Sequence, residues 1–538
     1  MTSPDTLQAL WRDFAARESL PALIAFSGHQ TETWSFAELH EVSYRVATAL
    51  VRRGIGRGDG VALVAPNSLR WIAAFWGIAT ASAVAVPLDA QNDDRELGRM
   101  IEIGRCRLAF TTSAISKRLH AMAPSCQMVI LDDTSETVTE EGWRRFLASV
   151  DAPLPPVVPA DTAVVVFTSG TTGNPKAVPL THRNLMANVL ALAATELVGP
   201  GDRALLPLPL YHAYPVVIGM VTPLALGCAV VLPAGISGPE LLAAMRDGAV
   251  TALVGVPRLY TALLDSVRRG IDRLPSPIAI LFRRLLTLAL QAERHHMHWF
   301  GRFSLGSLRR KIAPHLRLLV SGGAAIPIEV EETLDSLGWE MLTGYGLVET
   351  SSMLTFNPPH AAVPGSAGRP VPGMELRIAN PSSDGIGDIE TRGPSLFAGY
   401  RDDQAKTREA FTTDGWFRTG DLGERSADGY YTLSGRKSDL IISGGFNIYP
   451  REIEEFLQEQ EEVEEAAVAG VPDRVRGEMP VAYVVMKSTL DGEVLAERCR
   501  AKLASFKVPR AFVTVDRLPR NAMGKVQKHL LPKLPTSG

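Results

Sequence analysis

The stretch AVVVF (163–167), followed at once by TSGTTGNPK (168–176), joins an apolar run to a loop rich in glycine and hydroxyl side chains. Short apolar runs of this kind are typical of strands buried in a parallel sheet. The glycines let the loop bend so that successive backbone N–H groups point at one anion, while the hydroxyls and Lys176 supply further donors. The stretch therefore predicts a phosphate-binding loop at the end of a buried strand.

Two alternatives exist for this loop. Serine, threonine and glycine are also common in ordinary surface turns. A Walker A loop is excluded, because the spacing G-x-x-x-x-G-K-[ST] does not fit the residues of this stretch. The density of hydroxyls directly after an apolar strand favours phosphate binding over a plain surface turn.

Helical and strand patterns alternate through the segment that precedes the loop. Ser35 and Glu38 form a capping-box pattern, which marks the start of an amphipathic helix. A further helix is expected from Leu69, and strands are expected at 60–66, 83–87 and 127–131. Strands that alternate with helices build parallel sheets with helices on both faces. The expected fold class is α/β, with a large N-terminal domain of doubly covered, mostly parallel sheets.

Two later segments depart from this alternation. The segment 265–315 is helical in pattern and carries arginine and lysine among leucine, phenylalanine and tryptophan. From 378 to 431 the pattern changes to short strands separated by glycine and aspartate turns. We expect a helical insertion followed by a short-stranded β subdomain.

The C-terminal segment differs in character from the rest. An acidic helix is expected at 451–465 and a second helix at 495–503, with strands at 466–471, 481–486 and 511–515. This mixture is typical of a small α+β domain, which we expect to act as a mobile lid. The expected boundaries are 1–435 for the large domain, 436–439 for a hinge linker and 440–538 for the lid.

Composition and charge exclude several classes of protein. The 538 residues carry a formal charge of −3, which gives no electrostatic basis for binding nucleic acid. The four cysteines lie far apart, so neither a disulfide framework nor a zinc site is expected. The apolar run 215–233 approaches the length of a membrane span, but Pro223 and Gly227 interrupt it, and we expect a buried helix, a turn and a strand. The start of the chain shows no signal-peptide pattern, and a cytoplasmic protein is expected.

Four further motifs follow the loop. They are YGLVE at 345–349, WFRTGD at 416–421, GRKSD at 435–439 and PRNAMGK at 519–525. Together with TSGTTGNPK they resemble the signatures of the adenylate-forming superfamily, which includes acyl-CoA synthetases, luciferases and the adenylation domains of peptide synthetases. One such motif is weak, whereas five in this order over nearly the whole chain are specific. The resemblance implies an ATP-dependent enzyme that activates a carboxylic acid as its acyl-adenylate.

The resemblance also assigns the nucleotide site. The loop would hold the phosphates, Tyr345 would stack on adenine, and Asp421 and Arg436 would hold the ribose. The residues implied in nucleotide binding are Thr168, Ser169, Gly170, Thr171, Thr172, Gly173, Lys176, Gly323, Ala324, Gly344, Tyr345, Gly346, Asp421 and Arg436. Taken singly, a core tyrosine, an aspartate in TGD and an arginine in GRK are unremarkable, and only the family motifs favour these roles.

Three residues are implied in catalysis. Lys525 would place an ammonium between the carboxylate and the α-phosphate, because both reactants are anions and the site must supply positive charge. Glu349 and Thr168 would bind Mg²⁺, which usually takes few protein oxygens besides phosphates. His212 would lie at the wall between the acyl chain and the nucleotide, although a lone histidine beside apolar residues is more often an ordinary core residue.

A second half-reaction follows from the same resemblance. After adenylation the lid would swing about the linker, withdraw Lys525 and let the thiolate of coenzyme A attack the acyl carbonyl. Gly444 and Gly445 would line the thiol tunnel, since close backbone approach needs glycine. The implied cofactors are ATP, Mg²⁺ and coenzyme A.

Two positions depart from the family pattern. Val348 stands where a threonine usually donates a hydroxyl to the phosphate, and Ser438 stands where the hinge usually has aspartate or lysine. Losing one such hydrogen bond costs roughly 1–3 kcal/mol if the phosphate oxygen is left unpaired. A catalytically idle homologue that binds nucleotide or acyl-adenylate therefore stays open as the alternative from a different class.

The acid-binding wall is expected from 212–220, 254–260 and 321–325, which are apolar and lack a clear charged group. This favours a medium- or long-chain fatty acid over an amino acid or a dicarboxylate. The nearest alternatives are a fatty acyl-AMP ligase or an acyl-carrier-protein synthetase, and then an aryl-acid ligase. The basic, apolar stretch 280–311 would contact anionic lipid at the inner membrane face, or else form a surface helical hairpin.

Overall fold

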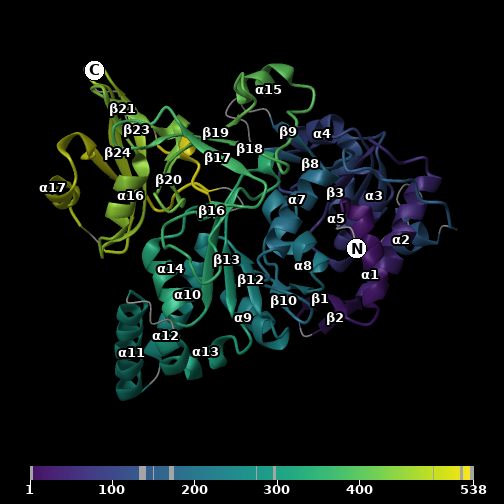
Figure 1. Ribbon diagram of the computed structural model, residues 1–538, viewed down its shortest axis with the longest axis horizontal. Coiled ribbons are helices and arrows are strands. Elements are labelled where there is room, and N and C mark those ends of the chain that lie inside the picture. The colour runs from purple at the N-terminus through teal and green to yellow at the C-terminus, as the bar shows by residue number, and fades with distance from the viewer. Residues whose placement is uncertain are drawn as a thin grey trace.

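The structure is a computed structural model that describes residues 4–28, 30–132, 141–148, 151–168, 175–273, 275–294, 299–488, 490–520 and 525–532. Three sheets belong to the large N-terminal part of the chain, and a fourth belongs to the C-terminal part. In Figure 1 the purple and blue elements of the first segment lie on one side of the molecule, and the yellow-green C-terminal elements form a lobe on the other.

One sheet carries the phosphate loop. Its strands follow the order β7 (Glu141–Gly142), β6 (Gln127–Ile130), β5 (Cys106–Thr111), β3 (Gly60–Val64), β4 (Val84–Pro87), β8 (Thr162–Thr168) and β9 (Lys176–Thr181). Every pair is parallel except β8 with β9, which form an antiparallel hairpin. The strands expected at 60–66, 83–87, 127–131 and 163–167 are confirmed.

Helices cover both faces of this sheet, as expected. On one face α1 (Leu7–Phe14), α2 (Phe36–Arg52) and α3 (Leu69–Thr80) share a core with alternate strand residues such as Val61. On the other face α4 (Asp94–Ile103) and α5 (Ser113–Met122) share a core with the intervening residues, such as Ala62. Successive strand residues point to opposite faces, so a doubly covered strand is apolar at every position. α6 (Trp143–Leu147) and α7 (His182–Ala193) contribute residues to the same core as α1, α2 and α3.

The capping box at the start of α2 is also confirmed. The Glu38 carboxylate accepts from the Ser35 N–H at 2.7 Å, and the Ser35 hydroxyl accepts from the Glu38 N–H at 3.2 Å. These two bonds satisfy backbone donors that the first turn of a helix leaves unpaired.

A second, nine-stranded sheet supplies another wall of the site. Its strands follow the order β16 (Arg369–Pro370), β15 (Thr355–Phe356), β14 (Glu340–Tyr345), β13 (Leu318–Ser321), β12 (Ala252–Gly255), β10 (Arg203–Leu205), β11 (Ala229–Leu232), β1 (Pro21–Ser27) and β2 (Gln30–Ser35). The strands from β14 to β1 are parallel, and the pairs at both edges are antiparallel. The apolar run 215–233 forms the π-helix η2 (Pro215–Val221), the helix α8 (Thr222–Ala225) and the strand β11, all buried as expected.

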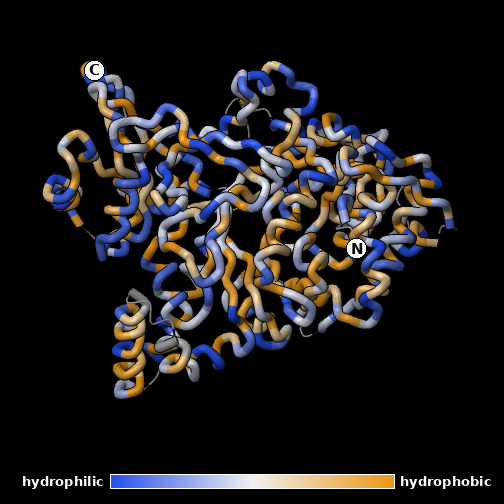
Figure 2. The backbone as a smooth tube through the Cα atoms, viewed as in Figure 1, coloured by the Kyte–Doolittle hydropathy of each residue, from blue (hydrophilic) through white to orange (hydrophobic). Residues whose placement is uncertain are grey.

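The segment 265–315 is helical, as expected, and lies at the periphery. α10 (Pro257–Asp272), α11 (Ser276–Arg294), α12 (Trp299–Ser304) and α13 (Gly306–Ile312) follow one another, and α9 (Gly238–Asp247) and α14 (Ile328–Ser336) are the other helices of this half. α11 stands at the edge of the molecule, with hydrophobic and hydrophilic residues mixed along it (Figures 1 and 2). Across the ranges that the structure describes, no helix is both long enough and apolar enough to cross a membrane.

The β subdomain expected at 378–431 is a four-stranded antiparallel sheet. It consists of β17 (Glu375–Ala379), β18 (Gly387–Arg392), β19 (Phe417–Arg425) and β20 (Tyr431–Arg436). A short helix that the sequence pattern did not predict, α15 (Gln404–Ala410), lies between β18 and β19, and the Asp403 side chain caps it. The 3₁₀ turns η3 (Val348–Thr350) and η4 (Lys437–Asp439) border this region.

The C-terminal lobe is a small α+β domain, as expected. It contains β21 (Ile441–Ser443), β22 (Phe446–Ile448), β23 (Val463–Asp473), β24 (Gly477–Met486), β25 (Ala511–Thr514), α16 (Pro450–Gln458) and α17 (Gly492–Lys502). The helix expected over 451–465 is wrong at its end, because it stops at Gln458 and Val463 begins a strand. Val463 is 1% exposed and β23 pairs along its length with β24, so sheet formation overrides the helical preference of the glutamates.

Candidate active site

A cavity of about 1210 Å³ lies between the large domain, the β subdomain and the C-terminal lobe. It opens near the ends of the parallel strands β13 and β14, where open α/β sheets usually bind their ligands. Of the residues expected in the site, the following line it: Thr168, Lys176, His212, Gly323, Gly344, Gly346, Glu349, Arg436 and Lys525. The cavity therefore joins motifs from the whole length of the chain.

The phosphate loop connects β8 to β9 in the sequence, and its two end residues are described. Thr168 pairs with Lys176 across the hairpin, and both side chains reach the cavity. The residues between them, Ser169, Gly170, Thr171, Thr172 and Gly173, lie outside the described residues, so their phosphate contacts stay a prediction. The Lys176 ammonium is 5.0 Å from the centroid of the Tyr400 ring. A cation over an aromatic face is attracted by the ring quadrupole, so this contact keeps Lys176 at the cavity.

Glu349 places a carboxylate at the cavity wall. It lies in η3, directly after β14, and is 9% exposed. Its Oε1 accepts a hydrogen bond from the Tyr400 hydroxyl at 2.8 Å, and no hydrogen bond from a described residue reaches Oε2. A carboxylate with one oxygen left as an acceptor, on the same cavity as the Thr168 hydroxyl, fits the few protein ligands that Mg²⁺ takes beside a phosphate.

Metal binding by protein side chains alone has no support in the described part of the chain. There, no group of three or more histidine, cysteine, aspartate or glutamate side chains is arranged to hold a metal ion. A Mg²⁺ ion bound to Glu349 and Thr168 would therefore need oxygens from the triphosphate and from water.

Val348 lines the cavity at the position where the family pattern has a threonine. Thr350 does not replace the missing hydroxyl, because it is fully buried and bonded to the backbone of Leu347. It accepts from the Leu347 N–H and donates to the Leu347 carbonyl, both at 3.0 Å. The second departure, Ser438, also lines the cavity, and its hydroxyl donates to Asp439 at 3.1 Å.

Asp421 is the centre of a buried polar cluster. Its Oδ2 accepts a hydrogen bond from the Tyr345 hydroxyl at 2.5 Å, and its Oδ1 lies 2.9 Å from Nε of Arg436. Burial raises the pKa of Asp421, and the Arg436 guanidinium opposes this rise. Burial and the Asp421 charge raise the pKa of Tyr345 well above its usual range, so its hydroxyl remains a donor. The register of β19 and β20 pairs Asp421 with Arg436, which builds the ion pair into the hairpin.

Two members of this cluster, Tyr345 and Asp421, are not directly exposed to the cavity, as they would be in an open nucleotide site. Tyr345 and Asp421 are both buried behind the cavity surface, and their neighbours Gly344, Gly346 and Gly420 line it instead. A ribose would have to share the Asp421 carboxylate with Tyr345 and Arg436. Stacking of adenine on Tyr345 stays a prediction.

Position 346 requires glycine for one reason, and positions 444 and 445 require it for another. A Cβ at Gly346 would come within 2.0 Å of the Ser352 carbonyl oxygen, so the chain there needs close backbone approach. Gly444 and Gly445 form the exposed turn between β21 and β22 with φ of +57° and +84°, and a Cβ at either position would meet no atom within 4 Å. Their turn conformation requires glycine here, and their role in a thiol tunnel stays a prediction.

Lys525 reaches the cavity from the C-terminal lobe. Residues 521–524 lie outside the described residues, and Arg520 and Val526 on either side of them form an antiparallel bridge. The Lys525 side chain is exposed to the cavity, yet the protein that surrounds it desolvates the ammonium and lowers its pKa. The Arg436 guanidinium lowers the pKa further, whereas Asp421 and Asp439 raise it. Lys525 therefore lies among the charged groups that were expected to hold the nucleotide.

His212 lies in the cavity wall as a neutral imidazole. Burial lowers its pKa to about 4, against the opposing charge of Asp89. Its Nε2 is buried and, within the described ranges, has no hydrogen-bond partner. A neutral ring nitrogen offers one hydrogen bond and no charge, so His212 can orient a bound group but cannot neutralise one.

The segments expected in the acid-binding wall lie only in part at this cavity. Residues 254–260 do not line it, whereas Tyr214 does, and the Tyr214 hydroxyl donates to the carbonyls of Gly255 and Val320 at 3.1 and 3.0 Å. The role of 254–260 in acid binding stays a prediction. Tyr260 is fully buried and donates to Val320 at 2.7 Å. Ala324 is exposed beside Gly323, which does line the cavity.

Sequence reasoning expected Ser321, within 321–325, but missed Tyr400 and Ser352 of the wall. Ser321 and Ser352 line the cavity, and their buried hydroxyl oxygens have no partner among the described residues. Tyr400 bonds Glu349 although the two are far apart in the sequence. Isolated residue types in a loop carry no spacing signal, so only the fold could reveal them.

Comparison with known proteins agrees with this geometry. The family model "AMP-binding enzyme" matches residues 10–401, and the model "AMP-binding enzyme C-terminal domain" matches 452–525. The chain is 34% identical to a sulfoacetate–CoA ligase of Cupriavidus necator, with 97% of each chain covered. It is 28% identical to a long-chain-fatty-acid–CoA ligase of Bacillus subtilis, with 98% of this chain and 94% of that protein covered.

A solved structure of a relative holds two of the three cofactors that the motifs imply, ATP and magnesium. It is the o-succinylbenzoate–coenzyme A synthetase of Bacillus subtilis in complex with ATP and magnesium, with a TM-score of 0.77, 26% identity, and 97% of this chain and 98% of that chain covered. The chain thus belongs to the AMP-binding enzymes of the adenylate-forming superfamily, in the group of ATP- and Mg²⁺-dependent, AMP-forming acid–CoA ligases.

Proposed function

We propose that this enzyme joins a medium- or long-chain fatty acid to the thiol of coenzyme A through an acyl-adenylate. One observation carries the proposal: Lys525 of the C-terminal lobe shares a cavity with Lys176 of the phosphate loop and with Glu349. Adenylation brings a carboxylate against a triphosphate, and cations fixed in advance stabilise the charge that develops between them.

In the first step a carboxylate oxygen of the acid attacks the α-phosphorus of ATP. The bond from that phosphorus to the bridging oxygen of the β-phosphate breaks, and pyrophosphate leaves with the electron pair. Lys525 would stabilise the charge at the α-phosphate, and Lys176 the charge on the departing phosphates. Glu349 and Thr168 would hold Mg²⁺, which neutralises phosphate charge when bound.

In the second step a thiolate attacks the acyl carbonyl, and AMP leaves with one oxygen of the original carboxylate. Lys525 must leave the cavity to open a path for the thiol. We place the hinge at 436–439, between a large domain of 1–435 and a lid of 440–538. Arg436 at the start of this linker is tied to Asp421, so the linker is anchored on the large domain.

The preference for a fatty acid rests on the side chains between His212 and the second sheet. Ala213, Ile218, Val320, Met353 and Phe356 line this part of the cavity, and they carry no charge to pair with a second carboxylate or an amine. The long-chain ligase of Bacillus subtilis supports the same class of acid. The sulfoacetate ligase has the higher identity, so short anionic acids are the competing substrates to test.

The acceptor is proposed to be coenzyme A, because the named relatives are CoA ligases. A fatty acyl-AMP ligase, or a synthetase that loads an acyl carrier protein, would carry out the same first step. The two outcomes differ only in the thioester formed, which incubation with CoA or with a holo-carrier protein distinguishes.

Acid-dependent exchange of labelled pyrophosphate into ATP tests the first step. We expect exchange with fatty acids of medium or long chain and little with sulfoacetate, malonate or aryl acids. Lys525→Ala should lower it by on the order of 10²-fold, as for the loss of one transition-state donor. Lys502→Ala, an exposed lysine of the same lobe, is the matched control and should behave as the wild type.

Absence of exchange with every acid, in protein that still binds ATP, would support an idle homologue and reject the proposal. Exchange driven best by a short anionic acid would keep the chemistry and reject the fatty acid.

The pH dependence of adenylation provides a second prediction. The pKa of Lys525 is lowered by desolvation and by Arg436, so the ammonium is lost as pH rises through that lowered pKa. We expect kcat/KM for ATP in the exchange reaction to fall at an alkaline pH below the usual lysine range of about 10.4. Lys525→Arg should be slower but should lose this alkaline fall. The same fall in both proteins would show that another group titrates.

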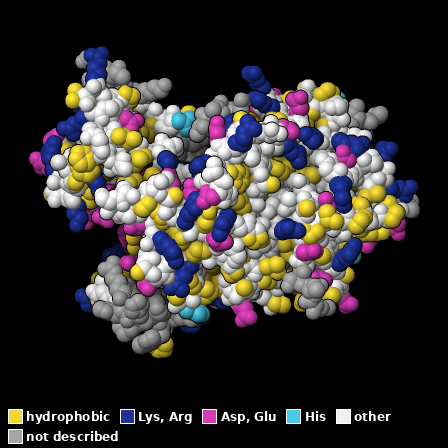
Figure 3. All heavy atoms as spheres, turned by 45° about the horizontal axis from the view of Figure 1, so that its top comes forward, with side chains coloured by type: hydrophobic (Ala, Val, Ile, Leu, Met, Phe, Trp, Pro, Cys, Tyr) yellow, Lys and Arg dark blue, Asp and Glu magenta, His cyan; other side chains and the backbone are white. Residues whose placement is uncertain are grey.

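We also propose that α11 brings the enzyme to an anionic lipid surface. Ile278, Ile280, Leu281 and Leu288 of this helix are each about half exposed, and Arg283 and Arg284 lie exposed among them. An exposed helix that combines apolar and basic side chains is suited to the interface of an anionic membrane. On the face shown in Figure 3, by contrast, basic and acidic side chains are interspersed over the surface.

Sedimentation with vesicles tests this contact. The protein should co-sediment with phosphatidylglycerol vesicles more than with phosphatidylcholine vesicles, and less as the salt concentration rises. Leu281→Ser with Leu288→Ser should weaken the binding, whereas Ile236→Ser, at an exposed isoleucine elsewhere on the large domain, should not. Equal binding by all three proteins would assign α11 to a surface hairpin.

A further inference from the structure

A short loop of the β subdomain passes between two predicted ATP-binding residues. This strap, residues 397–402, follows β18 and precedes α15. It carries one long polar side chain to the cavity, that of Tyr400. Tyr400 touches Glu349 through its hydroxyl and Lys176 through the face of its ring. It thereby links the predicted magnesium ligand to the predicted phosphate ligand.

The backbone of the strap is fixed at both ends to these same partners. The Phe397 N–H donates to the Glu349 carbonyl at 2.8 Å, and the Arg401 N–H donates to the Ala177 carbonyl, next to Lys176, at 3.0 Å. Between them the Tyr400 N–H donates to the Thr407 hydroxyl of α15 at 3.0 Å. These three hydrogen bonds, all donated by backbone N–H groups of the strap, position Tyr400 without any contribution from its own side chain.

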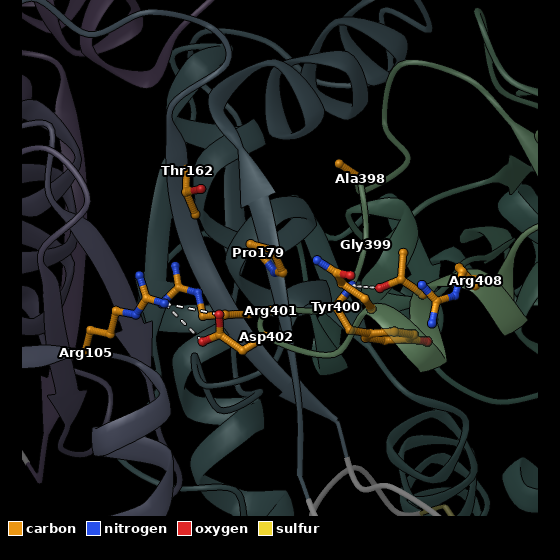
Figure 4. Close-up of a pocket in the computed structure, with 11 residues that line it drawn as sticks. Arg105, Thr162, Pro179, Ala398, Gly399, Tyr400, Arg401, Asp402 and Arg408 are labelled. Atoms are coloured by element: carbon orange, nitrogen blue, oxygen red, sulfur yellow. Dashed lines mark hydrogen bonds and ion pairs between the residues drawn. The ribbon is translucent and has the colours of Figure 1, made fainter.

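Ion pairing on the outer side of the strap adds to this anchoring. Figure 4 shows an open pocket there, with Arg105 and Arg401 beside Asp402. Arg105 bonds both oxygens of Asp402, at 3.2 and 3.1 Å. The Arg401 guanidinium donates to the Gly104 carbonyl at the end of α4 at 3.3 Å. Arg105 and Arg401 thus help to hold the strap.

The hydroxyl and the ring of Tyr400 contact different residues and therefore have different roles. The Tyr400 hydroxyl donates to the Glu349 carboxylate at 2.8 Å. Its bond to Oε1 fixes the rotation of the Glu349 carboxylate and leaves Oε2 as the acceptor. The ring holds the Lys176 ammonium by a cation–π contact at 5.0 Å, which does not depend on the hydroxyl.

We propose that Tyr400 is a positioning residue that holds Glu349 and Lys176 in the arrangement that receives magnesium-bound triphosphate. The hydroxyl serves the magnesium side of the site, and the ring serves the phosphate side. This inference rests on the proposed function, since it takes Glu349 as a magnesium ligand and Lys176 as a phosphate ligand. It adds a residue outside the recognised motifs to the site.

Two substitutions separate the two contributions. Tyr400→Phe removes the bond to Glu349 and keeps the ring under Lys176. Tyr400→Leu removes both. Tyr430→Phe is the matched control, because Tyr430 also donates its hydroxyl to a protein oxygen, the Ala361 carbonyl at 2.6 Å, and does not line the cavity.

The measurement is calorimetric binding of ATP without any acid, over a series of Mg²⁺ concentrations and in EDTA. Tyr400→Phe should raise the Mg²⁺ concentration needed for half of the effect by about tenfold, as for a lost hydrogen bond to a charged group, with binding in EDTA unchanged. Tyr400→Leu should in addition weaken binding in EDTA. Tyr430→Phe should match the wild type in both series.

An unchanged or lower Mg²⁺ requirement in Tyr400→Phe would overturn the inference. So would an EDTA titration of Tyr400→Leu that matches the wild type. Failure of the proposed function has a different signature, namely magnesium-dependent ATP binding by the wild type with no pyrophosphate exchange for any acid. Thermal unfolding of each variant shows whether a loss of binding follows from misfolding.

Discussion

Repulsion between two anions, a carboxylate and a triphosphate, is the constraint on which the organisation of this enzyme depends. In a partly desolvated cavity that repulsion is larger than in water, so the protein must supply cations in fixed positions before the reactants arrive. Here they come from three places: Lys176 beside the phosphate loop, Arg436 in the β subdomain and Lys525 on the C-terminal lobe. The fold combines them because it brings three distant segments of the chain to one cavity.

Bringing like charges together has its own cost, and the buried carboxylates offset it. Asp421 pairs with Arg436 and lies near Lys525, whose pKa it helps to hold up against desolvation. Among the described residues no cation is bonded to Glu349, and a tyrosine hydroxyl satisfies one of its oxygens instead. This difference fits their proposed roles, because a carboxylate that is already neutralised by arginine has less to offer to magnesium.

Much of this arrangement could be predicted from the sequence, and the failures have physical causes. The apolar strands and the Ser35 capping box are local patterns that the fold confirms. The family motifs predicted one shared site, and Lys176, Glu349 and Lys525 from three of these motifs line the same cavity. The predicted end of α16 was wrong because the glutamates of EEVEE favour a helix, whereas Val463 in that stretch pairs with β24 as part of β23. Residues 254–260 were expected at the acid-binding wall but do not line this cavity, and Tyr400 was missed because its bond to Glu349 is a tertiary contact.

The transfer of oxygen from the acid to AMP tests the central claim most directly, because it follows the atom on which adenylation depends. The acid is supplied with both carboxylate oxygens as ¹⁸O, together with ATP, Mg²⁺ and CoA, and the products are analysed by mass spectrometry. Attack of the carboxylate on the α-phosphorus predicts one ¹⁸O atom in AMP and none in pyrophosphate. Unlabelled AMP, or label in an inorganic phosphate product, would contradict an acyl-adenylate formed between Lys525 and Glu349.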